Sequence, residues 1–257
     1  MRLTDKTVVV TGASGIAAAG ARRAAREGAR VFVVSLEESD CRLLVDEIES
    51  EGGTAAGCAA DLTDEQATSG AFAEAVDFLG GLDGLFAVAG GSGRRFGDGP
   101  AHEMSLDAWQ KTFAINTHPM FLATHHALRV MKERGGSIVV VGSVLASSPV
   151  PSLFPTHAYA AAKGAANAYV TTLAAYYAKQ GIRVNGITPG LVTTPMSARA
   201  ASDADTVEYA RRKQPLAAGF LEPEDIAAAA VFLLSEDAAR ITGQVIAVDG
   251  GWSVTEA

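Results

Sequence analysis

Residues 7–17 read Thr-Val-Val-Val-Thr-Gly-Ala-Ser-Gly-Ile-Ala, a β-branched run followed by a glycine turn and the start of an Ala-rich helix. Glycines in such a turn let backbone amides and the positive end of the helix dipole approach a pyrophosphate group. The alternative is a strand-to-helix turn that needs glycine for its geometry alone. Because the turn follows the first strand of the chain, the sequence favours the phosphate-binding interpretation.

The alternation of short β-branched runs with longer stretches of helical period continues to the end of the chain. It is typical of βαβ units around a parallel sheet, and several runs are continuously apolar, as strands covered on both faces require. The expected strands are Thr7–Val10, Val31–Ser35, Thr54–Ala59, Gly84–Ala89, Ser137–Val141, Arg183–Thr188 and Val245–Val248. The expected helices are Ile16–Glu27, Cys41–Glu51, Glu65–Leu79, Leu106–Arg134, Ala158–Gln180 and Glu224–Ser235.

Glycines stand at the expected helix ends, where they return the chain to the next strand: Gly28, Gly52-Gly53, Gly80-Gly81, Gly135-Gly136 and Gly181. No linker interrupts the alternation. The sequence therefore predicts an α/β fold, a single doubly wound Rossmann-type domain over residues 1–257, with a seven-stranded parallel sheet flanked by helices.

Composition and charge narrow the classes of protein that fit. Apolar residues make up 48% of the 257 residues and the net charge is −8, which argues against nucleic acid as a partner. Cys41 and Cys58 lie far apart and outside any CxxC pattern, so neither a disulfide framework nor a zinc site is expected. No apolar leader precedes the first strand and no apolar stretch is long enough to cross a bilayer, so we expect a cytoplasmic protein without membrane contact.

Three histidines, His118, His125 and His126, fall on one expected helix. His125 and His126 are adjacent and point about 100° apart, so they cannot both face one metal ion. Surface or core histidines are the better interpretation, and no metal site is expected.

Tyr159 and Lys163 lie four residues apart in a strongly helical stretch, so their side chains share one helix face. A phenol titrates near about pH 10, too high for acid/base work at neutral pH, and a fixed ammonium group nearby stabilises the phenolate. The pair alone is a weak signal, because an Ala-rich helix can also carry a half-buried Tyr and a solvated Lys.

Two further motifs fall at the ends of expected strands. Ser143 follows the strand Ser137–Val141 at the carboxyl edge of the sheet, where doubly wound folds bind ligands. An ordinary turn residue is the alternative, and Ser147 and Ser148 fit the strand end less well. The run Pro-Gly-Leu-Val-Thr-Thr, residues 189–194, follows the sixth expected strand.

Together these motifs resemble the short-chain dehydrogenase/reductase superfamily in its classical type, over essentially residues 5–253. The resemblance implies an NAD(P)-dependent oxidoreductase that transfers a hydride between nicotinamide and the carbonyl or secondary alcohol group of a small-molecule substrate. It makes Tyr159 the acid/base, Lys163 the group that lowers the pKa of Tyr159 and binds the ribose, and Ser143 the residue that orients the substrate oxygen. Asn116 matches the family's proton-relay residue, with a polar side chain bonded inside its own helix as the alternative.

The same resemblance assigns the cofactor contacts. The Val192 backbone and the Thr194 hydroxyl hold the nicotinamide carboxamide, and Asp61 with Leu62 frames the adenine, unless Asp61 is the N-cap of the next helix. The cofactor-binding set is Gly12, Ser14, Gly15, Ile16, Ser35, Asp61, Leu62, Ala89, Gly90, Tyr159, Lys163, Pro189, Gly190, Val192 and Thr194.

The sequence departs from the family pattern at three places. The glycine turn is one residue shorter between Gly12 and Gly15, and Ala17 replaces its last glycine. After the fourth strand, Ala87 replaces an Asn that braces the central sheet in the family. These departures motivate a second hypothesis, a non-catalytic dinucleotide-sensing or scaffold protein on the same fold.

Cofactor preference depends on the end of the second strand, Ser35-Leu36-Glu37-Glu38. The family places an acidic residue there for NAD and a basic residue for the 2′-phosphate of NADP. Two carboxylates would repel that phosphate, and no Lys or Arg lies in the glycine turn, so NAD is expected, with NADP as the alternative. A solvated loop beginning at Glu37 and Glu38 is the other interpretation.

The substrate pocket is expected to come from the loops of residues 91–100, 144–157 and 197–214, the last of which resembles a lid. The apolar run 149–155 is a candidate for its lining. Arg94 and Arg95 are candidates for binding an acidic substrate group, with a solvated loop as the alternative. The last strand and the tail resemble the segments that pack subunits in family tetramers, so a homo-oligomer, tetramer or dimer, is expected.

Overall fold

A seven-stranded parallel sheet forms the centre of the computed structural model, which describes residues 1–256. The last residue of the predicted domain, Ala257, lies outside the described residues. The strand order is β3-β2-β1-β4-β5-β6-β7, and every neighbouring pair is parallel. The strands are β1 (Thr7–Thr11), β2 (Arg30–Ser35), β3 (Thr54–Ala59), β4 (Gly84–Ala87), β5 (Gly136–Val141), β6 (Ile182–Pro189) and β7 (Val245–Val248).

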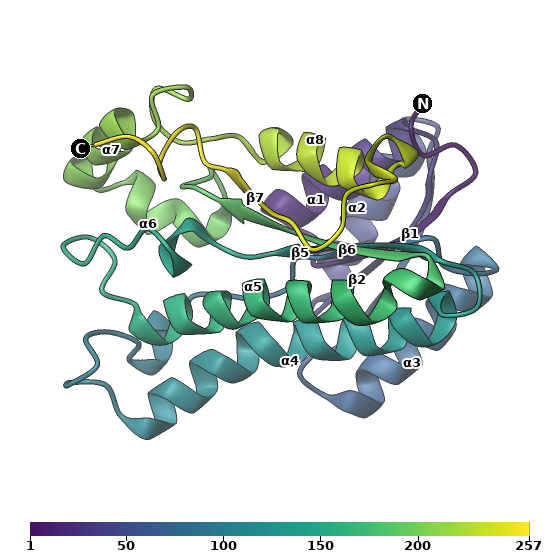
Figure 1. Cartoon of the computed structure of the whole chain (residues 1–257), viewed down its shortest axis with the longest axis horizontal. Helices are drawn as coiled ribbons and strands as arrows, with labels where there is room; N and C mark the ends of the chain where they lie inside the picture. The colour runs from purple at the N-terminus through teal and green to yellow at the C-terminus, as the bar shows by residue number, and fades with distance from the viewer. Residues whose placement is uncertain (257) are drawn as a thin grey trace.

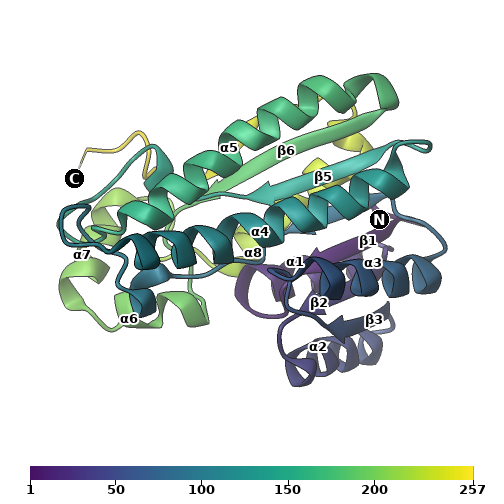
Figure 2. The ribbon, with the colours of Figure 1, turned by 90° about the horizontal axis from the view of Figure 1, so that it is seen from below.

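Helices cover both faces of this sheet. The α-helices are α1 (Gly15–Arg26), α2 (Glu38–Ser50), α3 (Glu65–Leu79), α4 (Leu106–Met131), α5 (His157–Tyr177), α6 (Ala198–Ala201), α7 (Ala204–Lys213) and α8 (Pro223–Leu234). Figure 1 shows α1, α2 and α8 on one face, and Figure 2, seen from below, shows α3, α4 and α5 in front of the other. The predicted doubly wound α/β fold with a seven-stranded parallel sheet is confirmed.

Two hydrophobic cores, one on each face of the sheet, hold the layers together. Along β1, Val8 and Val10 belong to the core under α1, α2 and α8, whereas Val9 belongs to the core under α3, α4 and α5. Successive strand side chains point to opposite faces, so both faces of β1 are buried. This double burial explains why its sequence is continuously apolar rather than alternating.

Some element boundaries differ from those expected. β4 ends at Ala87 rather than Ala89, because the N–H groups of Val88 and Ala89 donate to Oγ1 of Thr11, at 3.0 and 3.1 Å, instead of continuing the strand. α2 begins at Glu38, so the interpretation of Glu37 and Glu38 as the start of a solvated loop was wrong. The predicted glycine helix ends are confirmed for α1, α2 and α3, where Gly28, Gly52 and Gly80 have φ values of 96°, 85° and 76°. α4 and α5 end earlier than expected, at Met131 and Tyr177, several residues before Gly135 and Gly181.

The segment 197–214, expected as a loop, contains the helices α6 and α7. Asp203 caps α7 by accepting a hydrogen bond from the Thr206 N–H at 2.7 Å, and basic residues occupy the last turn of this helix. Both features favour a helix through its unpaired amides and its dipole. The prediction of an irregular segment here was therefore wrong, although the capping signals are present in the sequence.

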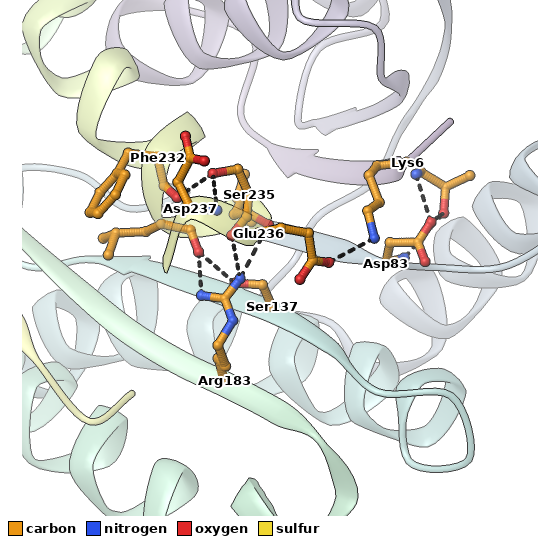
Figure 3. A network of polar contacts seen from close by, with 11 residues as sticks. Lys6, Asp83, Ser137, Arg183, Phe232, Ser235, Glu236 and Asp237 are labelled. Atoms are coloured by element: carbon orange, nitrogen blue, oxygen red, sulfur yellow. Dashed lines mark hydrogen bonds and ion pairs between the residues drawn. The ribbon is translucent and has the colours of Figure 1, made fainter. Parts of the chain in front are cut away.

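A polar network lies at the amino edge of the sheet (Figure 3). The Arg183 guanidinium, near the start of β6, donates to the carbonyl oxygens of Leu233, Leu234 and Ser235 at 2.6, 3.3 and 2.9 Å. The Ser137 hydroxyl donates to the Leu233 carbonyl at 2.9 Å. These donors satisfy carbonyls that have no partner within α8, and the cation complements the negative end of the helix dipole.

α1 packs closely on β4 because Gly20 has no side chain. A Cβ added at Gly20 would lie 2.7 Å from Cδ1 of Phe86, whose side chain is 1% exposed. The contact fixes α1 against the centre of the sheet and so fixes the position of its N-terminus.

We expect Gly20→Ala to lower the free energy of unfolding by about 1–3 kcal/mol, because the added methyl group overpacks the buried Phe86 ring. The matched control is Gly70→Ala in α3, where a Cβ would meet nothing within 4 Å. That change should raise the free energy of unfolding by about 0.5–1 kcal/mol through helix propensity. Urea denaturation measures both, and equal midpoints for the two variants would contradict the tight α1–β4 contact.

Candidate active site

A cavity of about 280 Å³ opens at the carboxyl edge of the sheet. β1 lies between β2 and β4, so the connections after these strands leave toward opposite sides, and this is where doubly wound folds form a ligand crevice. Most residues predicted from the sequence come together in its walls: Gly12, Ser14, Gly15, Ile16, Ala89, Gly90, Ser143, Tyr159, Lys163, Pro189, Gly190, Val192 and Thr194.

The glycine turn brings the N-terminus of α1 into this wall. Ser14 is the N-cap but makes no side-chain cap hydrogen bond, and the first turn of α1 contains no acidic residue. The positive end of the helix dipole is therefore not neutralised by the first turn itself. Gly12 and Gly15 have φ values of 100° and 52°, which only glycine adopts readily. These features fit the pyrophosphate of a dinucleotide.

Both glycines of the shortened turn lie in close contact with neighbouring side chains. A Cβ added at Gly12 would lie 3.1 Å from the Cβ of Ala17, so the alanine fits because residue 12 is a glycine. A Cβ added at Gly15 would lie 2.8 Å from Cγ2 of Thr194. The glycine turn thus contacts the turn after β6 directly, and the two halves of the cavity wall meet at Gly15 and Thr194.

Ser143, Tyr159 and Lys163 line the same cavity. Ser143 is 7% exposed at the end of β5, and its Oγ accepts a hydrogen bond from the Leu145 N–H at 3.2 Å. On α5, the Nζ of Lys163 lies 5.8 Å from the centroid of the Tyr159 ring. Burial raises the pKa of the Tyr159 phenol, and the neighbouring Ser143 side chain lowers that pKa in part. The serine and the tyrosine therefore offer two neighbouring hydroxyl groups to a ligand.

Lys163 is a buried base, 6% exposed, whose Nζ donates to the Val141 carbonyl at 2.9 Å. Burial lowers its pKa to about 8. No carboxylate within residues 1–256 forms an ion pair with it. At neutral pH the group is mainly a cation, and it favours a hydroxyl-bearing or anionic ligand and a neighbouring phenolate.

Asn116, 3% exposed, lies behind the cavity wall rather than in it. Its Nδ2 donates to the Gly91 and Thr112 carbonyls, each at 2.9 Å, and its Oδ1 accepts from the Gly91 N–H at 3.2 Å. These bonds reach beyond α4, so the side chain is not bonded within its own helix alone. A Cβ added at Gly90 would lie 2.8 Å from Oδ1 of Asn116 and 3.5 Å from Nζ of Lys163, which brings the two groups to the same glycine.

The end of β4 is braced from β1 in the absence of an Asn at position 87. Thr11 is 1% exposed, and its hydroxyl accepts the hydrogen bonds from Val88 and Ala89 described above. The brace therefore joins the two central strands at the cavity floor. The sequence analysis identified that Ala87 replaces the bracing Asn, but it did not identify Thr11 as the residue that braces the sheet instead.

Three predicted cofactor residues, Ser35, Asp61 and Leu62, lie outside the cavity wall. Leu62 is 6% exposed and belongs to a hydrophobic core. Ser35 ends β2, and Asp61 lies exposed just after β3. They border the sheet edge on the far side of the glycine turn from Tyr159.

The alternative that Asp61 caps the next helix was wrong. Asp64 is the N-cap of α3, since its carboxylate accepts from the Ala67 N–H at 2.7 Å. Asp61 instead accepts from the Thr63 hydroxyl at 2.7 Å and the Thr63 N–H at 2.8 Å, and these two bonds lower its pKa. The local turn thus leaves the Asp61 carboxylate ionised and exposed.

Asp98 was missed by the sequence analysis, and it positions the start of α5. Its side chain is 6% exposed, and its two carboxylate oxygens accept from the N–H groups of Ala158 and Tyr159, each at 3.0 Å. The N-cap of α5, Thr156, makes no side-chain cap bond of its own. Asp98 replaces that cap from 60 residues away and so fixes the backbone that carries Tyr159.

Gln214 was also missed, and it holds the turn after β6. The side chain is fully buried, its Oε1 accepts from the Leu191 N–H at 2.6 Å, and its Nε2 donates to the carbonyls of Leu191 and Gly219 at 3.1 and 2.6 Å. Any side chain at Gly190 would collide with this amide. The Pro189–Thr194 turn is therefore held by a residue that follows α7.

The expected substrate loops reach the cavity, and one residue of the tail joins them. Each of the three loops contributes residues to the cavity lining: Arg94 from residues 91–100, Phe154 from residues 144–157 and Arg199 from residues 197–214. Arg95 lies outside the lining. Trp252, fully buried, also lines the cavity and was not predicted.

Within residues 1–256, no group of three or more His, Cys, Asp or Glu side chains is arranged to hold a metal ion. None of the helices found in these residues combines the length and apolarity that crossing a membrane requires.

Comparison with known proteins identifies the class. A family model described as "Enoyl-(Acyl carrier protein) reductase" matches residues 10–253. The 2,5-dichloro-2,5-cyclohexadiene-1,4-diol dehydrogenase LinX of Sphingobium indicum is 36% identical over 98% of each chain. The inactive 2-(S)-hydroxypropyl-CoM dehydrogenase 2 of Xanthobacter autotrophicus is 42% identical over 90% of this chain and 98% of its own. A short-chain type dehydrogenase/reductase from Mycobacterium ulcerans, a solved structure, has a TM-score of 0.92 and 32% identity over 100% of this chain and 93% of its own.

The chain belongs to the short-chain dehydrogenase/reductase family. It is an NAD(P)-dependent oxidoreductase that acts on a small-molecule substrate, as the sequence predicted. The roles of individual residues stay predictions.

Burial of Lys163 should make protein stability depend on pH. The pKa is about 8 in the folded protein against 10.5 for the unperturbed group, so the unfolded state binds more protons between these values. The free energy of unfolding should therefore rise through this window, by up to about 1 kcal/mol per pH unit. Urea denaturation at a series of pH values should show that Lys163→Met removes the rise, whereas Lys179→Met, at an exposed lysine after α5, keeps it. Parallel profiles for wild type and Lys163→Met would contradict the buried-cation assignment.

Proposed function

We propose that residues 1–257 act as one dinucleotide-binding oxidoreductase domain that interconverts a carbonyl group and a secondary alcohol. Tyr159 is the acid/base, Ser143 orients the substrate oxygen, Lys163 favours the phenolate and binds the ribose, and Asn116 belongs to the proton relay. One observation carries the proposal: the N-terminus of α1, the Ser143 and Tyr159 side chains and the buried Lys163 cation all face one cavity.

The two hydroxyl groups act on one substrate oxygen. In the reducing direction, Ser143 donates a hydrogen bond to the carbonyl oxygen and Tyr159 transfers its proton to it; in the oxidising direction, the Tyr159 phenolate takes the alcohol proton. The nicotinamide group, when bound, supplies or accepts the hydride. Burial alone makes the phenolate costly, so the cation of Lys163 and the Ser143 side chain are needed to bring the pKa of Tyr159 down toward the working pH.

The proton that reaches Tyr159 passes along the back wall of the cavity. Lys163 uses one of its three N–H groups on the Val141 carbonyl and keeps the others for the ribose and for water. Asn116 approaches Lys163 at Gly90 and fixes the Gly91 backbone. A water molecule beside these groups completes the relay to solvent in this proposal.

The dinucleotide runs from the carboxyl end of β2 to the turn after β6 in this proposal. Ser35, Asp61 and Leu62 hold the adenosine end, and the glycine turn holds the pyrophosphate. Val192 and Thr194 hold the carboxamide of the nicotinamide. NAD is the preferred cofactor, because Glu37 is the N-cap of α2 and Glu38 and Asp40 lie in its first turn, where they occupy the positive end of the helix dipole and repel a 2′-phosphate.

We propose further that the protein forms a homo-oligomer, a dimer or tetramer. β7 is an edge strand with partly exposed Val and Ile side chains, and an open edge can pair with a second copy. Phe121 on α4 and Tyr176 on α5 are exposed large hydrophobic residues that a neighbouring subunit would cover. Cys41 and Cys58 are both free thiols, which supports a cytoplasmic location.

Tyr159→Phe should lower kcat by about 10²–10⁴-fold, because it removes the proton donor and leaves the ring. Tyr169→Phe is the matched control: this tyrosine lies on the same helix, partly buried, with its hydroxyl 3.3 Å from Oγ1 of Thr124, and should keep its activity. Turnover is followed by NAD(P)H absorbance on a panel of alcohols and ketones.

Full activity of Tyr159→Phe would show that another group is the acid/base. Tight dinucleotide binding by the wild type in calorimetry, with no turnover on the panel, would instead support the sensing or scaffold alternative.

Wild type should use NAD with a kcat/KM at least about 10-fold above that for NADP, because exposed like charges each cost roughly up to 1 kcal/mol. Glu37→Gln/Glu38→Gln should narrow this ratio by roughly 5- to 10-fold. Glu49→Gln, exposed near the other end of α2, is the control and should leave the ratio unchanged. Equal kcat/KM values for NAD and NADP in the wild type would overturn the assignment of NAD as the preferred cofactor.

A further inference from the structure

Two arginines from separate loops line the same cavity as Ser143 and Tyr159. Arg94 belongs to the short 3-10 turn Gly93–Phe96 and Arg199 belongs to α6. We propose that these two guanidinium groups bind an acidic group of the substrate, so that the enzyme acts on an anionic oxo or hydroxy compound rather than a neutral one. This inference rests on the proposed function, since it names the substrate class of the same site.

The charged residues that line the cavity all carry positive charge. Its charged lining residues are Arg94, Lys163 and Arg199, all basic, and no Asp or Glu of residues 1–256 lines it. The chain as a whole has a net charge of −8, so this concentration of positive charge runs against the overall balance. Arg94 and Arg199 are exposed and Lys163 is buried, and the field of such a cluster attracts an anion into the cavity.

The two guanidinium groups have no ion-pair partner of their own. In residues 1–256 other arginines form ion pairs, such as Arg26 with Glu51 at 2.7 Å, but neither Arg94 nor Arg199 has a carboxylate oxygen within 4.0 Å. Arg94 faces one carboxylate, Asp98, whose two oxygens already accept bonds from the start of α5.

Arg199 faces a carboxylate that is similarly engaged. Asp203 lies four residues further along the chain, and its Oδ1 accepts the cap bond of α7 from Thr206. The positive charge at the cavity is therefore available to a ligand.

Arg94 is exposed at the cavity, and only one of its side-chain donors is engaged within the part of the chain that the structure describes. Gly93 packs directly on the buried side chain of Thr112, and the Nη2 of Arg94 donates to the Leu153 carbonyl at 3.2 Å. One guanidinium donor is used in this way, and the others have no partner in residues 1–256. Burial and the neighbouring Arg199 both lower the pKa of Arg94, and an anion placed at the two groups would relieve that repulsion.

The remaining lining predicts the body of the substrate. Leu145, Phe154, Met196 and Trp252 surround the arginines and Ser143 in the cavity wall. Apolar walls favour a hydrocarbon skeleton, and the arginines favour a terminal acid. The substrate class is accordingly a carbonyl compound or alcohol with an apolar chain or ring that ends in a carboxylate, sulfonate or phosphate.

The test compares ligands that differ only in charge. Methyl ketones of equal chain length ending in a carboxylate, a sulfonate, a phosphate monoester or an uncharged carboxamide are reduced by the enzyme with NADH, at several chain lengths. Wild type should prefer at least one acidic series over the carboxamide by roughly 100-fold in kcat/KM, and this preference should weaken as ionic strength rises. Arg94→Gln and Arg199→Gln should each lower the preference about 10-fold, and the double variant should abolish it.

Arg95→Gln is the control, because Arg95 stacks on Phe96 outside the cavity and should keep the wild-type preference. Calorimetric titration of the NAD-loaded protein with the same acids gives a readout that does not need turnover. The inference is overturned if wild type and the double variant show the same acid-to-carboxamide ratio, or if the substitutions weaken NAD binding instead. Failure to reduce any ketone, with selective acid binding retained, would count against the proposed function and not against the arginine site.

Discussion

Burial of both faces of a parallel sheet is the constraint from which the site follows. With α1, α2 and α8 on one face and α3, α4 and α5 on the other, the central strands of the sheet can meet solvent only at their ends. At the amino edge, Arg183 satisfies the carbonyls at the end of α8. The carboxyl edge is open, and the first residues after β1, β5 and β6 meet there. Gly12, Ser143 and the Pro189–Thr194 turn are neighbours for this reason, although more than 100 residues separate the first two.

The open edge also carries positive charge that the surrounding residues within 1–256 do not neutralise. Lys163 is buried without a counter-ion, and the helix dipole of α1 is left unneutralised. A chain built for stability alone would pair or solvate these groups. Their unsatisfied charge is what an anionic dinucleotide and a phenolate can use, so the groups that weaken the isolated protein are the same ones that bind and orient its ligands. Long-range hydrogen bonds from Thr11, Asp98 and Gln214 hold the backbone around these groups.

The sequence predicted well what local physics determines. Short β-branched runs, several of them continuously apolar, located all seven strands, and glycines located the ends of α1, α2 and α3, because period and backbone conformation depend on neighbouring residues. Tyr159 and Lys163 share a helix face for the same reason. Contacts between distant segments left no such trace: nothing around Asp98 indicates that its carboxylate caps α5, and nothing around Gln214 indicates a link to Leu191. At Asp61 the choice between an adenine contact and a helix N-cap could not be made from propensity, because Asp61 forms a turn with Thr63 and Asp64 is the cap.

The buried amide of Gln214 has a practical consequence for anyone who wants to change what this enzyme accepts. Exchanging the segment of α6 and α7 for that of a relative is an obvious route to new specificity, since Arg199 and its neighbours line the cavity. A graft that replaces Gln214 by a residue without a side-chain amide removes three hydrogen bonds from the Leu191 and Gly219 backbone and releases the turn that carries Val192 and Thr194. Chimaeras joined before Gln214 keep that turn intact, so the junction, more than the transplanted sequence, should decide which chimaeras fold around a working cofactor site.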